Sequence, residues 1–459
     1  MDLSGQTVVV VGLGRSGLAA ARLLAGRGAR VVASDRRPAE ELGPEVLGLS
    51  AAGVRLELGA HRESSFTSAA LVVVSPGVPW DLPELHAARR AGVAVIAELE
   101  LGYRCLTGTV GAVTGTKGKS TTTAALGAML REAGRDVRVA GNIGEALSGQ
   151  VEGSSPETVF VLEVSSFQLE GTERFRPRVA VFLNLTPDHL DRHLDFAEYA
   201  SAKARIFENQ TPDDWAVVNA DDPQVLALAR RGRARLLGFH PRPGGAPPAA
   251  SEVAWFDSGL ARLSLEGHTE ELFALSAVRL PGAHLAGDLL AAAAAARLLG
   301  ARADAVSRAV ASFRGAEHVL EYVGEVGGVA FYNDSKATNV DAVRHSLEAF
   351  DGPILAIMGG RYKGGDFATL HEPAARRVKT VFAIGEASDL LIRALSPAVA
   401  TVRSASLGQA VRRAFAAAAP GDTVLLAPGC SSFDMFRDYA ERGAAFKAEV
   451  QRLAEDARG

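Results

Sequence analysis

Residues 111–121 read "GAVTGTKGKST", an apolar run that passes into a glycine-rich loop and then into hydroxyl residues. An order of strand, glycine loop and helix is typical of phosphate-binding loops, because backbone N–H groups at the helix start hold anions. The commonest such loop, GxxxxGK[ST], would require glycine at position 113, where Val113 stands. The stretch therefore predicts a nucleotide-binding α/β domain with a loop of shorter spacing.

Composition narrows the class of protein. A chain of 459 residues with 47% apolar residues and 48 glycines predicts a globular α/β protein of more than one domain. A formal net charge of -4 argues against nucleic acid, and no apolar run is long enough for a membrane span. Cys105 and Cys430 form neither a disulfide framework nor a metal pattern, which favours a cytoplasmic protein with small-molecule partners.

Lysine is scarce in this sequence. Seven lysines stand against 42 arginines, so arginine fills most positions that need only a positive charge. Arginine cannot replace an amine that approaches phosphate as a compact charge or one that is covalently modified. The lysines inside motifs are therefore functional candidates: Lys117, Lys119, Lys203, Lys336 and Lys363.

Apolar β-branched runs alternate with helical segments along the whole chain, which is typical of parallel sheets covered on both faces. We predict an α/β chain of three domains, residues 1–100, 101–313 and 314–459, each a mostly parallel sheet with flanking helices. The first and last are expected to be Rossmann-like and the central one to resemble a P-loop ATPase. Predicted strands include 7–14, 29–35, 70–78, 109–115, 158–166, 179–186, 213–222, 329–335, 353–360, 380–385 and 422–429.

The first strand runs into Gly12-Leu-Gly14-Arg-Ser-Gly17, a GxGxxG turn, and Asp35 ends the next strand. This pair alone would indicate NAD, but such a turn binds any diphosphate at the helix start. "SPGV" at 75–78 follows another strand and is expected to close the same pocket.

Polar residues stand where strands of the central domain end. Glu163 would be costly to bury without a cation or hydrogen bonds, and His189 lies beside Asp188 and Asp191, ahead of Lys203. Ser120, a carboxylate and phosphate oxygens suit Mg²⁺, whereas a second site that uses His189 is less typical of this ion.

Several motifs together resemble the Mur ligase family. They are "GTKGKST", "GNIG" (141–144), "LEVSSFQLE", "NLTPDHLDRH", "AKARIFEN", "VVNADD", "YNDSKATN" (332–339), "GGRYKGGDF" (359–367) and "APGCSSFDMF". Their order and full-length coverage are most similar to the D-glutamate-adding branch. The resemblance implies an ATP-dependent ligase of peptidoglycan precursor synthesis, joining D-glutamate to UDP-N-acetylmuramoyl-L-alanine through an acyl phosphate. It implies a cytoplasmic enzyme, here expected to be a monomer.

The same resemblance assigns residues to ligands. It places ATP on Gly115, Thr116, Lys117, Gly118, Lys119, Ser120, Thr121, Asp288, Asp334 and Lys336, and the UDP substrate on Ser16, Asp35, Arg36, Arg37, Ser75 and Asn142. It places D-glutamate on Thr338, Lys363, Ser432, Phe433 and Tyr439. Ser120 and Glu163 would hold one Mg²⁺, and His189 with a carbamylated Lys203 a second; Lys119, His189 and Lys203 would act in catalysis.

Some positions depart from the family pattern. Lys117 stands where Asn is more usual, Leu285 and Asp288 where two asparagines are common, and Val319 where Arg is common. Three alternatives stay open. The GLGRSG turn would suit a nucleotide-dependent oxidoreductase, and Val319 and Asp288 suggest a UDP-sugar-binding module without catalysis. The third alternative is a ligase for another amino acid or for folate.

Overall fold

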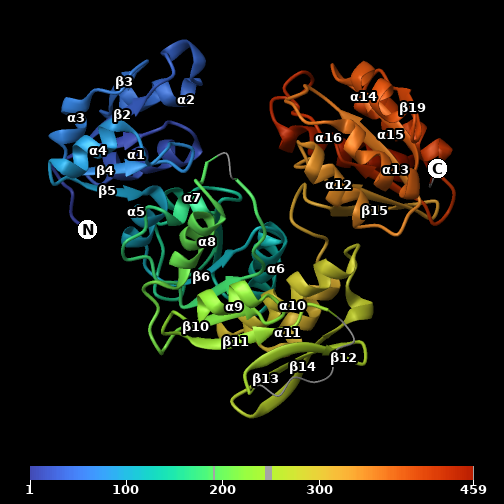
Figure 1. The fold of residues 1–459 in the computed structure, drawn as a ribbon, viewed down its shortest axis with the longest axis horizontal. Helices are drawn as coiled ribbons and strands as arrows, with labels where there is room; N and C mark the ends of the chain where they lie inside the picture. The colour runs from blue at the N-terminus through green and yellow to red at the C-terminus, as the bar shows by residue number, and fades with distance from the viewer. Residues whose placement is uncertain (190–191, 243–250, 458–459) are drawn as a thin grey trace. The chain divides into compact units, whose positions relative to one another are not determined.

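The computed structural model describes residues 1–189, 192–242 and 251–457 (Figure 1). The chain forms two compact units, Met1–Ala274 with Asp288–Val310, and Leu275–Gly287 with Ala311–Gly459. Most of the predicted exposed loop at 240–252 and the predicted Asp191 lie outside the described residues. No described helix combines the length and apolar composition that a membrane crossing requires.

The first sheet of unit one is parallel, in the order β3-β2-β1-β4-β5. Its strands are β1 (Thr7–Val11), β2 (Arg30–Asp35), β3 (Arg55–Leu58), β4 (Leu71–Val74) and β5 (Ala94–Ala97). The associated helices are α1 (Arg15–Gly26), α2 (Pro44–Leu47), α3 (Glu63–Thr67) and α4 (Pro83–Arg90), and α5 (Glu98–Cys105) follows β5. Val8, Val10 and Val73 are fully buried, as the continuous apolar runs predict.

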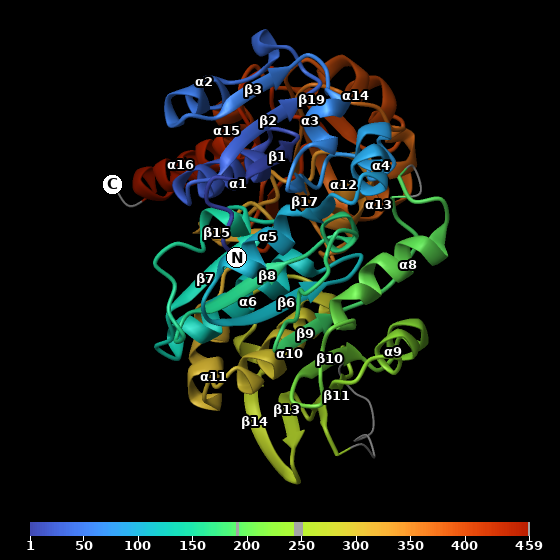
Figure 2. The same cartoon turned by 90° about the vertical axis from the view of Figure 1, so that its left-hand side faces the viewer.

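The second sheet of unit one has the order β14-β13-β12-β11-β10-β9-β6-β8-β7 (Figure 2). Its parallel strands are β6 (Thr109–Thr114), β7 (Val137–Gly141), β8 (Val159–Glu163), β9 (Val179–Phe182), β10 (Trp215–Asn219), β11 (Arg235–Phe239) and β12 (Val253–Asp257). The antiparallel strands β13 (Leu260–Leu265) and β14 (His268–Ala274) extend it, an addition that the sequence analysis did not predict.

Helices of this region are α6 (Lys119–Glu132), α7 (Ser166–Leu169), α8 (Phe196–Ala204), α9 (Pro223–Ala229), α10 (Ala283–Leu298) and α11 (Ala303–Ser312). The helix after the quoted loop begins at Lys119.

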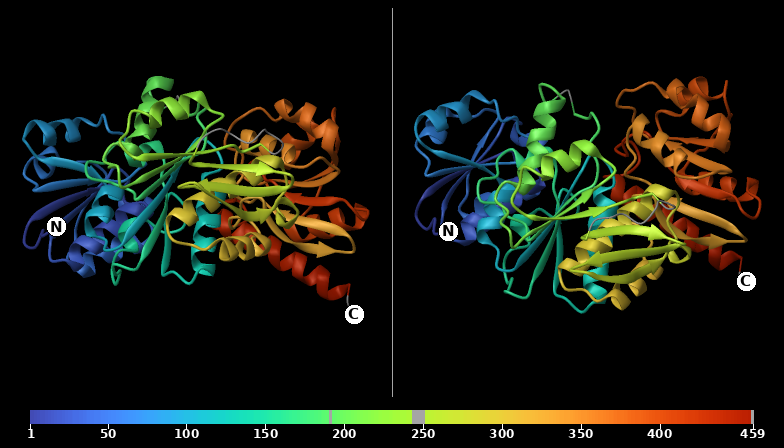
Figure 3. Two further views of the ribbon diagram at one scale, coloured as in Figure 1. Left: turned by 90° about the horizontal axis from the view of Figure 1, so that it is seen from below. Right: turned by 60° about the horizontal axis from the view of Figure 1, so that its bottom comes forward.

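The sheet of unit two has the order β15-β16-β20-β17-β18-β19 and is parallel except for β15. Its strands are β15 (Glu321–Val326), β16 (Val329–Asn333), β17 (Ile354–Gly359), β18 (Val378–Ile384), β19 (Ala400–Arg403) and β20 (Thr423–Leu426). Its helices are α12 (Val340–Glu348), α13 (His371–Arg377), α14 (Ser388–Leu395), α15 (Leu407–Ala417) and α16 (Tyr439–Asp456). The last helix, α16, contacts α15 and β15 (Figure 3, red).

Candidate active site

The Lys119 side chain bonds back to the loop between β6 and α6, from which it extends. The Lys119 amine donates to the carbonyl oxygens of Gly115 at 2.9 Å and Thr116 at 2.7 Å. Gly118 has φ +80°, and a Cβ atom there would lie 2.3 Å from an Asp288 oxygen, so only glycine fits. The loop therefore places an amine beside the start of α6, where backbone N–H groups favour phosphate.

A hydroxyl at the start of α6 meets a carboxylate at the end of β8. Ser120 Oγ donates to Glu163 Oε2 at 2.7 Å, and Asn142 Nδ2 donates to Glu163 Oε1 at 2.7 Å. Glu163 is 1% exposed and stands at the carboxyl end of β8. This donor set fits Mg²⁺, which binds one or two protein oxygens together with phosphate oxygens and water.

Lys203 approaches the same loop from α8. Its amine donates to the Gly115 carbonyl at 2.8 Å and lies 4.7 Å from the centre of the Tyr199 ring. Lys203 is 2% exposed. Burial, followed by the charge of Lys119, lowers the pKa of this amine to about 6. The amine is therefore mostly uncharged at neutral pH.

His189 lies in a loop with an uncommon backbone. Its φ is 54°, its N–H donates to Asp188 Oδ1 at 2.9 Å, and its ring centre lies 5.0 Å from that of Phe167. The side chain is about half exposed. Within the described residues, no three acidic, histidine or cysteine side chains form a metal cluster.

A cavity of about 430 Å³ lies beside the Gly12–Gly17 turn. Its lining includes five of the six residues predicted for the UDP substrate, but not Arg36: Ser16, Asp35, Arg37, Ser75 and Asn142. It also includes Pro76, Gly77 and Val78 of the predicted closing loop, and Arg15, Gly141 and Gln168, which the sequence analysis did not assign to the UDP substrate. Ser75 Oγ donates to the Gly12 carbonyl at 2.7 Å, so the 75–78 loop closes this pocket as predicted.

Asp35 is already hydrogen-bonded at both oxygens. It accepts from the Leu13 N–H at 2.7 Å and from the Arg37 backbone and guanidinium at 2.8–3.1 Å. Burial opposes its ionisation, but these hydrogen bonds outweigh burial and lower its pKa to about 2. Asp35 thus holds Arg37 and the glycine turn in place at the cavity wall.

The Asp288 carboxyl group is not one of the predicted metal ligands. It packs against Gly118, and burial raises its pKa to about 7, partly offset by Lys119. A carboxyl group at this position is therefore partly protonated near neutral pH, which reduces its repulsion of an anion bound at the loop.

Unit two carries the remaining predicted residues after the carboxyl ends of β16, β17 and β20. Asp334 is buried and accepts a hydrogen bond from Ser346 Oγ; burial raises its pKa to about 6, and that hydrogen bond partly offsets the rise. The other predicted residues of these segments are Lys336, Thr338, Lys363, Ser432, Phe433 and Tyr439. Ser432 is buried, whereas Lys363 and Phe433 are exposed.

The sequence analysis missed Arg442, which is fully buried on α16. Its guanidinium donates to Ser335 Oγ at 3.0 Å, to the Ser335 carbonyl at 2.9 Å and to the Cys430 carbonyl at 3.1 Å. A longer contact of 3.4 Å reaches the Gly359 carbonyl. One side chain thus joins the three strand-end segments that carry the predicted D-glutamate residues.

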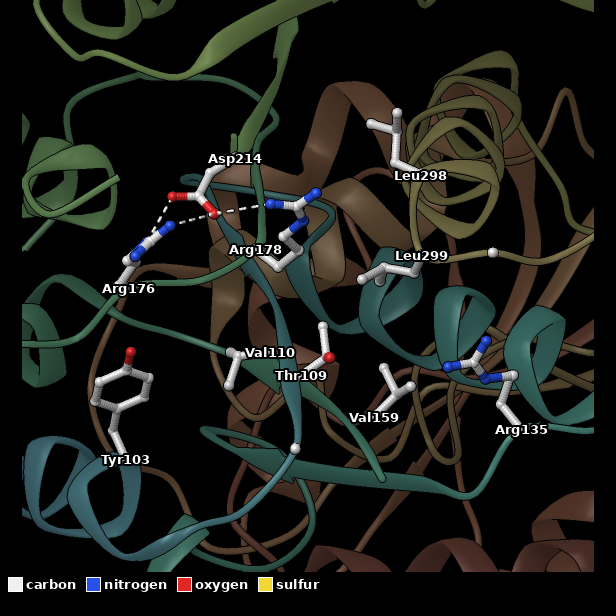
Figure 4. A pocket seen from close by; sticks show the side chains of 12 residues that line it. Tyr103, Thr109, Val110, Arg135, Val159, Arg176, Arg178, Asp214, Leu298 and Leu299 are labelled. Atoms are coloured by element: carbon white, nitrogen blue, oxygen red, sulfur yellow. Dashed lines mark hydrogen bonds and ion pairs between the residues drawn. The ribbon is translucent and has the colours of Figure 1, made fainter. Parts of the chain in front are cut away.

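A separate cavity of about 470 Å³ opens at the amino ends of the strands of the central sheet (Figure 4). Asp214 lies between Arg176 and Arg178, with an Arg176 contact of 2.7 Å and an Arg178 contact of 3.6 Å (Figure 4). Both arginines are thereby paired, and none of the predicted site residues lines this cavity. We infer that these ion pairs hold together the segments that lead into neighbouring strands, and that they are not part of the nucleotide site.

Comparison with known proteins identifies the class. Profiles for the MurD-like N-terminal domain, the Mur ligase middle domain and the Mur glutamate ligase domain match residues 6–97, 113–296 and 320–430. The chain belongs to the Mur ligase family. It is 48% identical over 449 residues to the UDP-N-acetylmuramoylalanine–D-glutamate ligase of Acidobacterium capsulatum, covering 97% of this chain and 96% of that protein. It is 43% identical over 454 residues to the enzyme of the same name from Geotalea daltonii, covering 99% of each.

Solved structures agree in fold. The UDP-N-acetylmuramate–alanine ligase of Thermotoga maritima has a TM-score of 0.57 at 19% identity, covering 97% of this chain and 99% of that one. The MurF ligase of the same organism, solved with ADP, has a TM-score of 0.57 at 20% identity, covering 99% and 96%.

Proposed function

We propose that this protein joins D-glutamate to UDP-N-acetylmuramoyl-L-alanine, with ATP converted to ADP and phosphate, in peptidoglycan precursor synthesis. The observation that carries the proposal is the grouping of Lys119, Lys203, Ser120 and Glu163 around one glycine loop. Full-length similarity to relatives named for this reaction supports it. Family membership implies ATP and Mg²⁺.

The substrate carboxylate is a poor electrophile until one of its oxygens becomes a phosphate leaving group. In the proposed reaction, a carboxylate oxygen bonds to the γ-phosphorus while the bond to the ADP oxygen breaks. The D-glutamate amine then bonds to the acyl carbon, loses a proton, and phosphate departs. The Lys119 amine lies at the loop to which the ATP phosphates are assigned. In the proposed reaction it therefore stabilises the negative charge on the transferring phosphoryl group.

Metal binding is assigned to two sets of residues. Ser120 and Glu163 would hold one Mg²⁺, and His189 with carbamylated Lys203 the second; such ions neutralise phosphate charge. The buried, uncharged amine of Lys203 supports carbamylation, in which Nζ bonds to the carbon of CO₂ and releases a proton. The product is a carboxylate, which supplies the oxygen ligand that Mg²⁺ prefers.

The UDP part of the substrate is assigned to the cavity lined by Ser16, Asp35, Arg37, Ser75 and Asn142. Arg36, which does not line this cavity, keeps the assignment that the family resemblance gives it. ATP is assigned to residues 115–121 with Asp288, Asp334 and Lys336, and D-glutamate to Thr338, Lys363, Ser432, Phe433 and Tyr439. We further propose three domains with boundaries near residues 100 and 313, a cytoplasmic location and a monomeric state.

Phosphate release with UDP-N-acetylmuramoyl-L-alanine across a panel of D- and L-amino acids tests the proposal. D-Glutamate should give the highest kcat/KM. Preference for another amino acid would identify a different ligase, and the absence of ATP turnover with every amino acid would favour a binding module.

A further inference from the structure

The loop that carries His189 is gathered around one aromatic ring. The centre of the Phe167 ring lies 5.0 Å from that of His189 and 5.4 Å from that of His193, which stacks on it. The guanidinium carbon of Arg192 lies 4.6 Å from the same centre. Cation–π and stacking contacts of this kind fix the side chains of His189, Arg192 and His193 relative to α7.

Arg192 also reaches out of this loop. Its Nη2 donates to the Val78 carbonyl at 2.8 Å and lies 3.8 Å from Glu170 Oε2. The Arg192 side chain is 20% exposed, so its contacts are partly shielded from water. One planar cation thus connects Phe167, Glu170 and the 75–78 loop.

Val78 belongs to the wall of the substrate cavity. It lines that cavity with Ser75, and a Cβ atom at Gly12 would lie 2.5 Å from a Val78 methyl group. The Val78 side chain therefore packs closely against the Gly12 turn. A ligand that orders this turn also orders the acceptor of the Arg192 hydrogen bond.

The other end of the connection is the backbone of His189. The His189 carbonyl accepts from the N–H groups of Arg192 and His193, both at 3.0 Å. His189 has φ 54°, a conformation that costs a non-glycine residue energy and persists only when its surroundings impose it. Arg192 is part of those surroundings.

We propose that Arg192 is a positioning residue that links occupancy of the substrate cavity to the conformation of His189. The identity of the cavity as a UDP site, and the use of His189 in the reaction, rest on the proposed function. Because coupling between two sites is reciprocal, ordering of His189 by Arg192 also strengthens binding at the 75–78 loop.

The chain offers a matched control in Arg89. Its guanidinium lies 5.2 Å from the centre of the Trp80 ring, and Nη1 donates to the Trp80 carbonyl at 3.1 Å. Arg89→Met thus removes an arginine–aromatic contact and a carbonyl hydrogen bond in the first sheet's domain, without touching the His189 loop.

The experiment follows the imidazole signal of His189 by NMR in metal-free protein, assigned by its loss in His189→Gln. UDP is the probe because it lacks the sugar-peptide end of the substrate, so a change at His189 would come from binding in the UDP cavity. Calorimetry measures UDP binding separately. UDP should shift the His189 signal in the wild type and in Arg89→Met, but not in Arg192→Met. Arg192→Lys, which keeps the charge without the planar guanidinium, should give a reduced shift.

A kinetic readout separates positioning from general stability. Arg192→Met should lower kcat about tenfold with the KM for ATP unchanged. If UDP binds to the wild type without shifting the His189 signal, the inference about Arg192 is wrong but the proposed substrate site still stands. An undiminished shift in Arg192→Met or Arg192→Lys has the same meaning. Absence of UDP binding to the wild type would instead contradict the proposed substrate site.

Discussion

Lys119 and Lys203 donate to the same acceptor, the carbonyl oxygen of Gly115, at 2.9 Å and 2.8 Å. Two amines on one carbonyl repel each other when both are charged, which contributes to the lowered pKa of Lys203. The pair therefore divides into a charged amine at the phosphate loop and an uncharged amine suited to modification.

Removing the Lys203 amine should abolish ligation. Lys203→Ala is expected to lower kcat by roughly a hundredfold or more, since the proposed carbamate ligand of a charge-stabilising metal could no longer form. Added short-chain carboxylates should restore part of the activity, because they supply the missing oxygen ligand. Steady-state phosphate release measures both effects.

Lys379 supplies the control, because its amine pairs with Asp422 outside the motifs. Lys379→Ala should keep near-normal activity. Ordinary turnover by Lys203→Arg would rule out the carbamate, because arginine cannot form it.

Lys203 should also make stability depend on pH in the free protein. Its pKa is about 6 in the folded chain against 10.5 unfolded, so between these values the unfolded state binds more protons. The resulting penalty is full below about pH 6 and fades as pH rises toward 10.5. Lys203→Met should therefore gain most in free energy of unfolding near about pH 6, and less by about pH 9, relative to wild type.

Urea unfolding in CO₂-free buffer measures this difference at each pH. If the difference in free energy of unfolding between wild type and Lys203→Met stays constant across this pH range, the Lys203 amine does not take up a proton on unfolding.

Lys117 is expected to compensate for the missing arginine at position 319. Its backbone is fixed by Asn184, through hydrogen bonds of 2.9 Å and 3.1 Å, while its side chain is exposed at the loop. Lys117→Asn should raise the KM for ATP about tenfold, equivalent to ~1.4 kcal/mol. Adding Val319→Arg should recover part of that loss.

The alternative compensator, Arg314, has its guanidinium 5.7 Å from the centre of the Tyr322 ring. Arg314→Gln should leave the KM for ATP unchanged and thus serves as the comparison. An unchanged ATP saturation curve for Lys117→Asn would mean that the protein needs no substitute for the arginine.

Arg442 should support amino-acid binding through the segments that it joins. Its loss removes charge-assisted hydrogen bonds and leaves carbonyls unpaired, so Arg442→Met should raise the KM for D-glutamate roughly tenfold or more. The KM for the UDP substrate should stay unchanged.

The surface pair Arg412–Glu449 gives a matched control, since Arg412 is 58% exposed and exposed pairs contribute little. Arg412→Met should resemble wild type. An unchanged D-glutamate KM in folded Arg442→Met would show that the joined segments hold their shape without it.

The strands and the phosphate loop could be predicted because their signals are local. Continuous valine runs such as Val8–Val11 identify buried parallel strands, and the glycines around Lys119 identify the loop. The antiparallel addition was missed, although Ser258-Gly259 and Glu266-Gly267, all with positive φ, mark its two turns. Their short, mixed strands carry a weaker periodic signal.

Contacts between distant segments could not be predicted from the sequence. Arg442 lies in a charged stretch of helix typical of an exposed face, and its partners are backbone carbonyls from three other segments. The role of Arg192 likewise depends on its hydrogen bond to Val78, which only the fold brings beside it. Backbone acceptors carry no sequence signature, so such residues need a structure to be identified.

The formation of an acyl phosphate is the central claim, and isotope transfer tests it most directly. UDP-N-acetylmuramoyl-L-alanine with isotopically labelled carboxylate oxygens is turned over with ATP, Mg²⁺ and D-glutamate, and the products are analysed by mass spectrometry. The proposed reaction predicts one labelled oxygen in the released phosphate, with ADP as the nucleotide product. Unlabelled phosphate, or AMP in place of ADP, would contradict it.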